Sequence, residues 1–187
     1  MICPSCGKGT LSPKILSRPY MIIKDRATNP EMETDTVFVQ STTNKWGYPE
    51  HTASYYLNKE LAMVGLQLST MSLSCLYLHI PPKSRKTKDD KVLVNGCFGF
   101  SLRELIKIAN TKKAILLMGA ETIRTFIGLP STEIYGLANN SELLPDVPVI
   151  IPAPNPDNIM RQPIGELRFA LREFANQIKV YEEYSKI

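Results

Sequence analysis

The stretch Met71–Gly119, MSLSCLYLHIPPKSRKTKDDKVLVNGCFGFSLRELIKIANTKKAILLMG, determines the predicted fold. It begins with a near-continuous apolar run at Met71–Ile80, passes through a basic loop that opens with two prolines, and ends in a second apolar run at Ala114–Met118. Short uninterrupted apolar runs are typical of strands buried on both faces of a parallel sheet. Between them, apolar side chains from Phe98 to Ala109 recur at helical spacing. This order of strand, loop, helix and strand predicts an α/β fold.

The rest of the chain continues the alternation. Further strands are predicted at Pro19–Asp25 and Val147–Ile151, further helices at His51–Leu68, Glu121–Ile127 and Gly165–Tyr184, and a short strand or extended lid at Thr36–Gln40. Strands that alternate with helices imply a parallel sheet covered on both faces. At 187 residues the chain is predicted to form one domain, with residues 1–18 as a cysteine-bearing N-terminal segment.

Composition excludes few classes of function. The chain is 43% hydrophobic and 21% charged, as is usual for a globular protein. No apolar run approaches the roughly 20 residues that span a bilayer, and the N-terminus lacks a signal-peptide pattern, so we expect a cytoplasmic protein without a membrane partner. The net charge of +4 permits a nucleic-acid partner without requiring one.

The four cysteines are the main candidates for chemistry. Cys3 and Cys6 form a CxxC pair, Cys75 ends an apolar run, and Cys97 directly precedes the predicted helix, where the helix dipole would stabilise a thiolate. In a reducing compartment such cysteines favour a metal or redox role over disulfides. Spacing alone leaves three interpretations open: an iron–sulfur cluster, a zinc ion, and small buried side chains at Cys75 and Cys97.

The order of these motifs resembles the iron–sulfur uracil-DNA glycosylases of families 4 and 5. In that family a CxxC near the start is followed by a strand that ends in cysteine, a Pro-Pro-containing basic loop, and a cysteine that opens a helix. Here the corresponding elements are Thr70–Cys75, Pro81–Thr87 and Cys97, and Ala114–Gly128 is similar to the strand and helix that follow in the family. Pro154–Arg161 is similar to its C-terminal motif.

The resemblance implies a three-layer α/β/α domain with a short parallel four-stranded sheet. It also implies a [4Fe–4S] cluster, with zinc as the alternative, held by all four cysteines, Cys3, Cys6, Cys75 and Cys97. The implied partners are DNA, single-stranded DNA included, and a DNA polymerase or another replication or repair protein. The protein would then be associated with the nucleoid, or with host cytoplasm in the case of a phage or viral protein.

The motifs that carry catalysis in the family are altered. The glycines of its first motif are missing at Lys24–Thr28, where Asp25 is the candidate acidic residue, and Asn155 stands where the family has a histidine that stabilises the leaving base. The family's asparagine that reads the base has no recognisable match near Met71. Loss of a charge-stabilising donor typically costs 100- to 1000-fold in rate, on the order of 3–4 kcal/mol. We therefore expect weak or absent uracil excision.

The features that contact DNA in the family are better preserved in this sequence than its catalytic motifs. The resemblance implies that a basic set of side chains contacts phosphates, and that aromatic side chains stack on an extruded base. The basic set is Lys83, Arg85, Lys86, Lys88 and Arg161, and the stacking candidates are Phe38, Trp46 and Tyr48. The leading prediction is a DNA-binding accessory of replication or repair. The alternatives are an active glycosylase that removes uracil or another base with altered catalytic residues, and a zinc-containing α/β protein that binds a small ligand.

Overall fold

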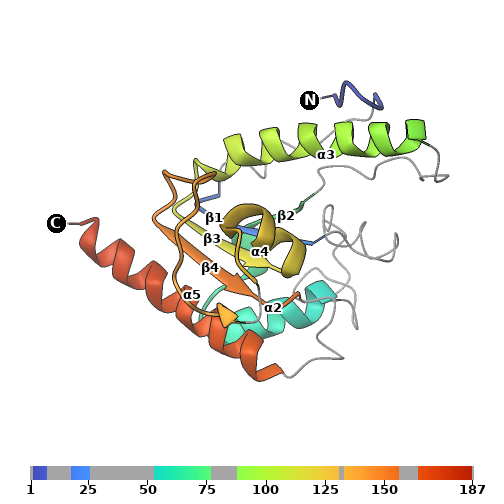
Figure 1. The fold of residues 1–187 in the computed structure, drawn as a ribbon. Helices are drawn as coiled ribbons and strands as arrows, with labels where there is room; N and C mark the ends of the chain where they lie inside the picture. Colours follow the sequence, from blue (N-terminus) through green and yellow to red (C-terminus); the bar gives the residue numbers. More distant parts are fainter. Residues whose placement is uncertain are drawn as a thin grey trace.

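A computed structural model of the chain describes residues 2–7, 18–25, 53–76, 88–130, 133–155 and 164–186; the side chains of residues 53, 54 and 88–90 are outside this description. The predicted fold is confirmed. Four parallel strands form one sheet in the order β2-β1-β3-β4, and helices cover both of its faces in a three-layer α/β/α arrangement (Figure 1). Within the described part of the chain, no helix is long and apolar enough to cross a membrane.

The strands follow the apolar runs of the sequence. They are β1 (Tyr20–Lys24), β2 (Ser72–Cys75), β3 (Ala114–Met118) and β4 (Val149–Ala153). All five residues of β3 are buried because this central strand is covered by helices on both faces. The last strand begins two residues later than predicted, because its first residue, Val149, pairs with the first residue of β3, Ala114. It lies at the edge of the sheet, a position that tolerates Pro152.

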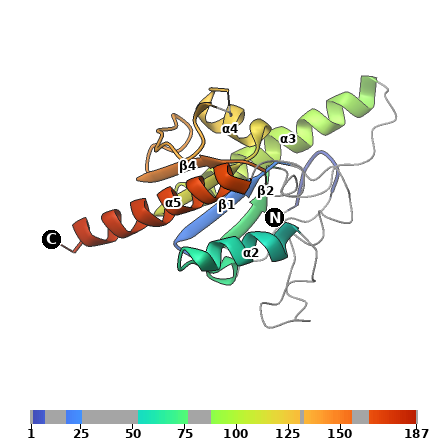
Figure 2. The ribbon, with the colours of Figure 1, turned by 90° about the horizontal axis from the view of Figure 1, so that it is seen from below.

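The helices form two separate layers. One face of the sheet packs against α2 (Ala53–Met63) and α5 (Ile164–Tyr184), and the other against α3 (Lys88–Ala109) and α4 (Ala120–Ile127) (Figures 1 and 2). Helix α2 ends earlier than predicted, because Gly65 has a left-handed backbone (φ 80°). Leu68–Thr70 forms a 3-10 turn instead.

The bounds of α3 differ from the sequence prediction. It was expected to start at Phe98, after Cys97, but it begins at Lys88 and holds Cys97 in its interior. Two glycines at Gly96 and Gly99 lower the helix propensity of this segment and obscured its true start. The dipole of a helix N-terminus therefore does not act on Cys97.

Candidate metal centre

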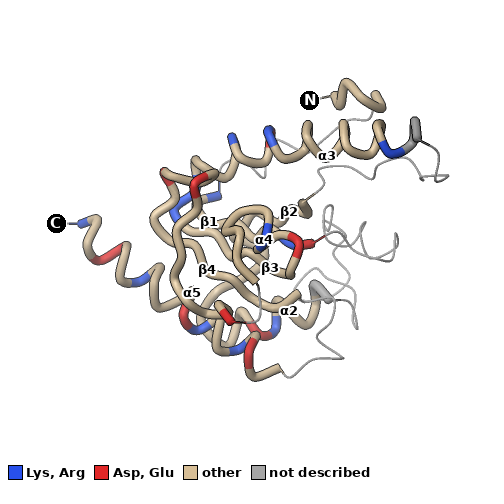
Figure 3. The backbone as a smooth tube through the Cα atoms, viewed as in Figure 1, with Lys and Arg blue, Asp and Glu red and all other residues tan. Residues whose placement is uncertain are grey.

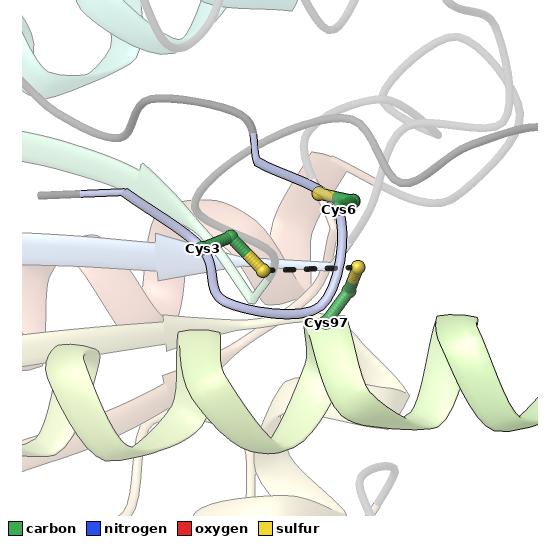
Figure 4. A group of neighbouring side chains, drawn as sticks. All are labelled: Cys3, Cys6 and Cys97. Carbon is green, nitrogen blue, oxygen red and sulfur yellow. Dashed lines mark hydrogen bonds between the residues drawn. The ribbon is translucent and has the colours of Figure 1, made fainter.

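Three of the four cysteines meet in space. The sulfur atoms of Cys3, Cys6 and Cys97 all lie within 4.8 Å of one another, and those of Cys3 and Cys97 are 3.9 Å apart (Figure 4). Cys3 and Cys97 are fully buried, and Cys6 is partly buried. Thiolates are strong ligands for zinc and for iron–sulfur clusters, so these three side chains can bind a metal.

A tight turn presents the first two thiols together. The backbone N–H of Gly7 donates a hydrogen bond of 2.8 Å to the carbonyl of Cys3, which closes a turn over Pro4–Cys6. Gly7 itself has a φ of 71°, a left-handed conformation that glycine adopts without a steric penalty. The sequence CPSCG therefore places both sulfurs of the CxxC pair on one turn, as in many metal-binding hairpins.

The turn lies directly on α3 at Gly96. A Cβ atom at this position would be 2.5 Å from Ser5 Oγ and 3.2 Å from Ser5 Cβ, so a larger residue would require the Ser5 side chain to rotate and the turn to move slightly away from the helix. Phe100, one turn along the helix, packs against Cys3 and Cys97 from the same side. Sequence reasoning did not assign Gly96 a role. The signal was a glycine next to a cysteine within a helical pattern, which indicates close approach of another backbone.

The two buried thiols differ in acidity. Burial raises the pKa of Cys3, but hydrogen bonds from the backbone N–H groups of Cys6 and Ser5 outweigh it, so the net pKa is lowered. Burial raises the pKa of Cys97 to about 12, and hydrogen bonds with the Cys6 and Cys3 sulfurs act in the same direction. At neutral pH the metal-free site thus keeps at least the Cys97 proton, and a metal that binds there would release it.

Cys75 is not part of the three-sulfur group among the described residues. It ends β2, where it pairs in register with Lys24, and it is 3% exposed. Met71 and Leu73 of the same segment pack on the face covered by α2 and α5. Because side chains alternate along a strand, Cys75 points to that face, whereas Cys97 lies in α3 on the other one.

Asp25 has a structural role at the end of β1. Its two carboxylate oxygens accept hydrogen bonds from the backbone N–H groups of Glu121 (3.3 Å) and Thr122 (2.7 Å), in the first turn of α4. Gly119, the residue before this helix, has a φ of 103°, and a Cβ there would collide with the Asp25 carboxylate. Asp25 therefore caps α4 from a neighbouring strand, and both of its oxygens have backbone donors.

Asn155 lies near the same edge of the sheet. It follows β4, and Asp25 follows β1, so both residues lie beyond the carboxyl ends of parallel strands, with β3 between them. This edge is where parallel α/β sheets bind ligands.

The other predicted site residues are not placed by the structure. The basic residues Lys83, Arg85, Lys86 and Arg161 and the aromatic residues Phe38, Trp46 and Tyr48 lie outside the described residues, as does the predicted strand or lid at Thr36–Gln40. Lys88 begins α3, and its side chain is also outside the description.

Comparison with known proteins assigns no family to the chain. No family model matches the sequence, and a search of curated proteins finds no match. Interpretation of the site therefore depends on the motifs of the sequence, the fold and the geometry of the cysteines.

Proposed function

We propose that this protein is a DNA-binding protein of the uracil-DNA glycosylase type, with a structural metal group at its clustered cysteines. The main support for the proposal is that the N-terminal CxxC pair and Cys97 lie close together in a protein with a four-stranded parallel sheet. The family resemblance implied this combination of cysteines and fold, and composition and spacing alone did not require it.

A structural role for the metal is supported by the small size of the apolar cluster that the described residues form at the N-terminal turn. Its described core contacts are confined to a small cluster in which Cys3, Cys97 and Phe100 are buried and Cys6 packs against them. So small an apolar cluster contributes little to stability by burial. A metal bound by these thiols would fasten the turn to α3, and its binding free energy would become folding free energy.

A [4Fe–4S] cluster is the leading candidate for the metal group. Such a cluster takes four thiolates, and the chain contains four cysteines. Cys75 would then be the fourth ligand, which requires the end of the edge strand β2 to rearrange so that this thiol comes round the edge of the sheet to the other three.

A zinc ion is the second candidate, and the distance between two of the cysteine sulfur atoms favours it. The Cys3 and Cys97 sulfurs are 3.9 Å apart. With a Zn–S bond of about 2.3 Å, the sulfurs of a tetrahedral site are separated by about 3.8 Å. Three cysteines would hold the ion, and Cys75 would remain an ordinary buried side chain.

Weak or absent excision is supported by the altered motifs at Asp25 and Asn155. Both oxygens of Asp25 accept backbone hydrogen bonds from α4, so this carboxylate also serves as a helix cap, and each oxygen keeps a second lone pair for a water molecule. Asn155 can donate a hydrogen bond to a leaving base, but it cannot supply the positive charge of a protonated histidine. An active glycosylase with altered catalytic residues is the alternative.

The DNA-binding part of the proposal depends on the basic loop and Arg161. Lysine and arginine side chains neutralise phosphates without reading sequence, so binding would be sensitive to salt and tolerant of sequence. A scaffold that binds DNA and has lost excision would serve a polymerase or a repair protein as an accessory.

An excision assay tests the proposed function. Anaerobically purified protein is incubated with a single-stranded oligonucleotide that contains one uracil, and abasic product is measured beside Asp25→Ala and Asn155→Ala. We expect no product above the level of these two variants. Product formed well above both variants would overturn the accessory role and establish the active glycosylase.

A further inference from the structure

The face of the molecule opposite the three-cysteine group carries a pocket between α2 and α5. The pocket has a volume of about 370 Å³. It is lined by Glu60, Met63, Val64, Arg168, Leu171 and Arg172. The sheet lies between α2 and α5, which supply these residues, and α3, which holds Cys97 (Figure 1). Nothing in the proposed DNA-binding function uses it.

The pocket combines an apolar floor with an exposed apolar rim. The partly buried Val64 forms this floor and packs against the core between the sheet and the two helices, and Leu171, which is fully buried, belongs to that core. Met63 is 79% exposed at the edge of the pocket. A flexible, polarisable methionine that stays in water in the free protein is well suited to cover an apolar group of a partner.

One side of the pocket is fixed by an ion pair. Arg168 donates two hydrogen bonds to the Glu60 carboxylate, from Nε at 2.7 Å and from a terminal guanidinium nitrogen at 3.0 Å. Glu60 is 7% exposed, so its charge is largely removed from water and is neutralised by Arg168. The pair therefore shapes the wall of the pocket and neutralises Glu60, while the Arg168 side chain remains 49% exposed.

Arg172 is the charged side chain of the pocket with which a ligand can pair. It lies one turn after Arg168 on the same face of α5, and it has no ion-pair partner among the residues that the structure describes. Lys59, which is exposed beside Glu60 on α2, adds a second positive charge nearby. Figure 3 shows that α5 carries charges of both signs along its length.

We propose that this pocket binds a protein segment that presents a carboxylate next to a large apolar side chain. The apolar side chain would fill the space over Leu171 and Val64 under Met63, and the carboxylate would pair with the planar guanidinium of Arg172. The excess of positive charge beside the apolar floor selects an acidic segment over a neutral or basic one. The volume suits one such anchor with its neighbouring residue. This inference does not depend on the proposed DNA-binding function.

Fluorescence anisotropy with labelled synthetic peptides tests the proposal. The probe set contains hexapeptides with three aspartates next to one phenylalanine, and matched peptides with lysines in place of the aspartates. The acidic set is expected to bind the full-length protein. Arg172→Glu is expected to weaken binding about tenfold and Met63→Ser a few-fold, whereas Lys179→Glu on the same helix leaves it within twofold.

The Lys179 variant is the matched control, because it makes the same change in net charge at an exposed position away from the pocket. Equal weakening by both charge reversals would show non-specific attraction and overturn the proposal, and so would the absence of binding by every acidic peptide. A single-stranded oligonucleotide that displaces the peptide and requires Arg172 would assign the pocket to nucleic acid instead. Far-ultraviolet circular dichroism checks that each variant is folded.

Discussion

The Cys3 and Cys97 sulfur atoms lie 3.9 Å apart although 94 positions separate the two residues in the sequence. Cys3 belongs to an N-terminal turn, and Cys97 belongs to the interior of α3. Contact between the two segments has an entropic cost, because it orders the N-terminal turn and closes a loop. A metal shared by both segments would offset this cost, so metal removal should release the turn.

Replacement of Cys97 is the first test of the metal site. Cys97→Ser should abolish stoichiometric metal binding and lower the midpoint of thermal unfolding, because it removes the only ligand of the group that α3 supplies. Metal content by elemental analysis and thermal unfolding are the measurements. Full metal occupancy in this variant would contradict the proposed site.

Cys75→Ser separates the two candidate metals. If the group is a [4Fe–4S] cluster with four cysteine ligands, this variant should lose iron and sulfide together with the visible absorption of the cluster. If three cysteines hold a zinc ion, the variant should keep its zinc, because Cys75 lies outside the three-sulfur group. Elemental analysis of anaerobically purified protein decides between them.

Gly96→Ala tests the contact between the turn and α3. The new methyl group would meet the Ser5 side chain, which must rotate away, and the turn must move slightly from α3, which should weaken the alignment of the cysteines. Metal content should fall even though alanine favours a helix by about 0.5–1 kcal/mol relative to glycine.

Gly99→Ala is the control, because a Cβ atom there meets nothing within 4 Å. This variant should keep its metal and unfold at a slightly higher temperature. Equal metal content in the two variants would show that the turn does not depend on close contact at Gly96.

Replacement of Asp25 tests its role as a helix cap. Asp25→Ala removes both acceptors from the first turn of α4 and should destabilise the protein by about 1 kcal/mol, the usual cost of a lost cap. Asp25→Asn keeps one acceptor oxygen and should cost less. Chemical denaturation measures both, and an unchanged free energy of unfolding in Asp25→Ala would refute the capping role.

The ion pair between Glu60 and Arg168 predicts a dependence of stability on pH. Hydrogen bonds from Arg168 lower the pKa of the Glu60 carboxyl in the folded protein. A depressed folded pKa stabilises the protein above the ordinary glutamate value of about 4.3, and this contribution is lost as the pH falls through the folded pKa. Arg168→Gln should therefore lower the unfolding temperature at pH 7, and the difference from the unmodified protein should shrink as the pH falls below the ordinary glutamate value. A difference independent of pH would show that the arginine acts by packing alone.

The sheet could be predicted from sequence because each of its strands lies within a short, mainly apolar stretch, although β2 itself contains two serines. Ala114–Met118 has no polar residue, and a segment of this kind is stable only where both faces are covered. The start of α3 could not be predicted, because Gly96 is unfavourable for a helix and its reason is a tertiary contact with Ser5. The local sequence pattern around a residue does not reveal its tertiary contacts.

The candidate site was predicted only in part. Spacing identified the CxxC turn, but which of the distant cysteines would meet it depends on how the strands and helices are arranged. The alternation of side chains along β2 turns Cys75 to one face of the sheet, and α3 packs on the other. The role of Asp25 was also hidden, because the helix that it caps lies far away in the sequence, at Glu121 and Thr122.

The most direct test of the central claim is salt-dependent binding of single-stranded DNA by anaerobically purified protein, followed by fluorescence anisotropy. If the protein binds DNA through its basic residues, the logarithm of the association constant should fall linearly with the logarithm of salt concentration, with a slope of about −0.7 for each phosphate neutralised. The combined Arg85→Ala and Arg161→Ala variant should show a shallower slope, by roughly one unit, and weaker binding, whereas Lys179→Ala should not. No binding at low salt, or a slope that the double variant leaves unchanged, would contradict the account.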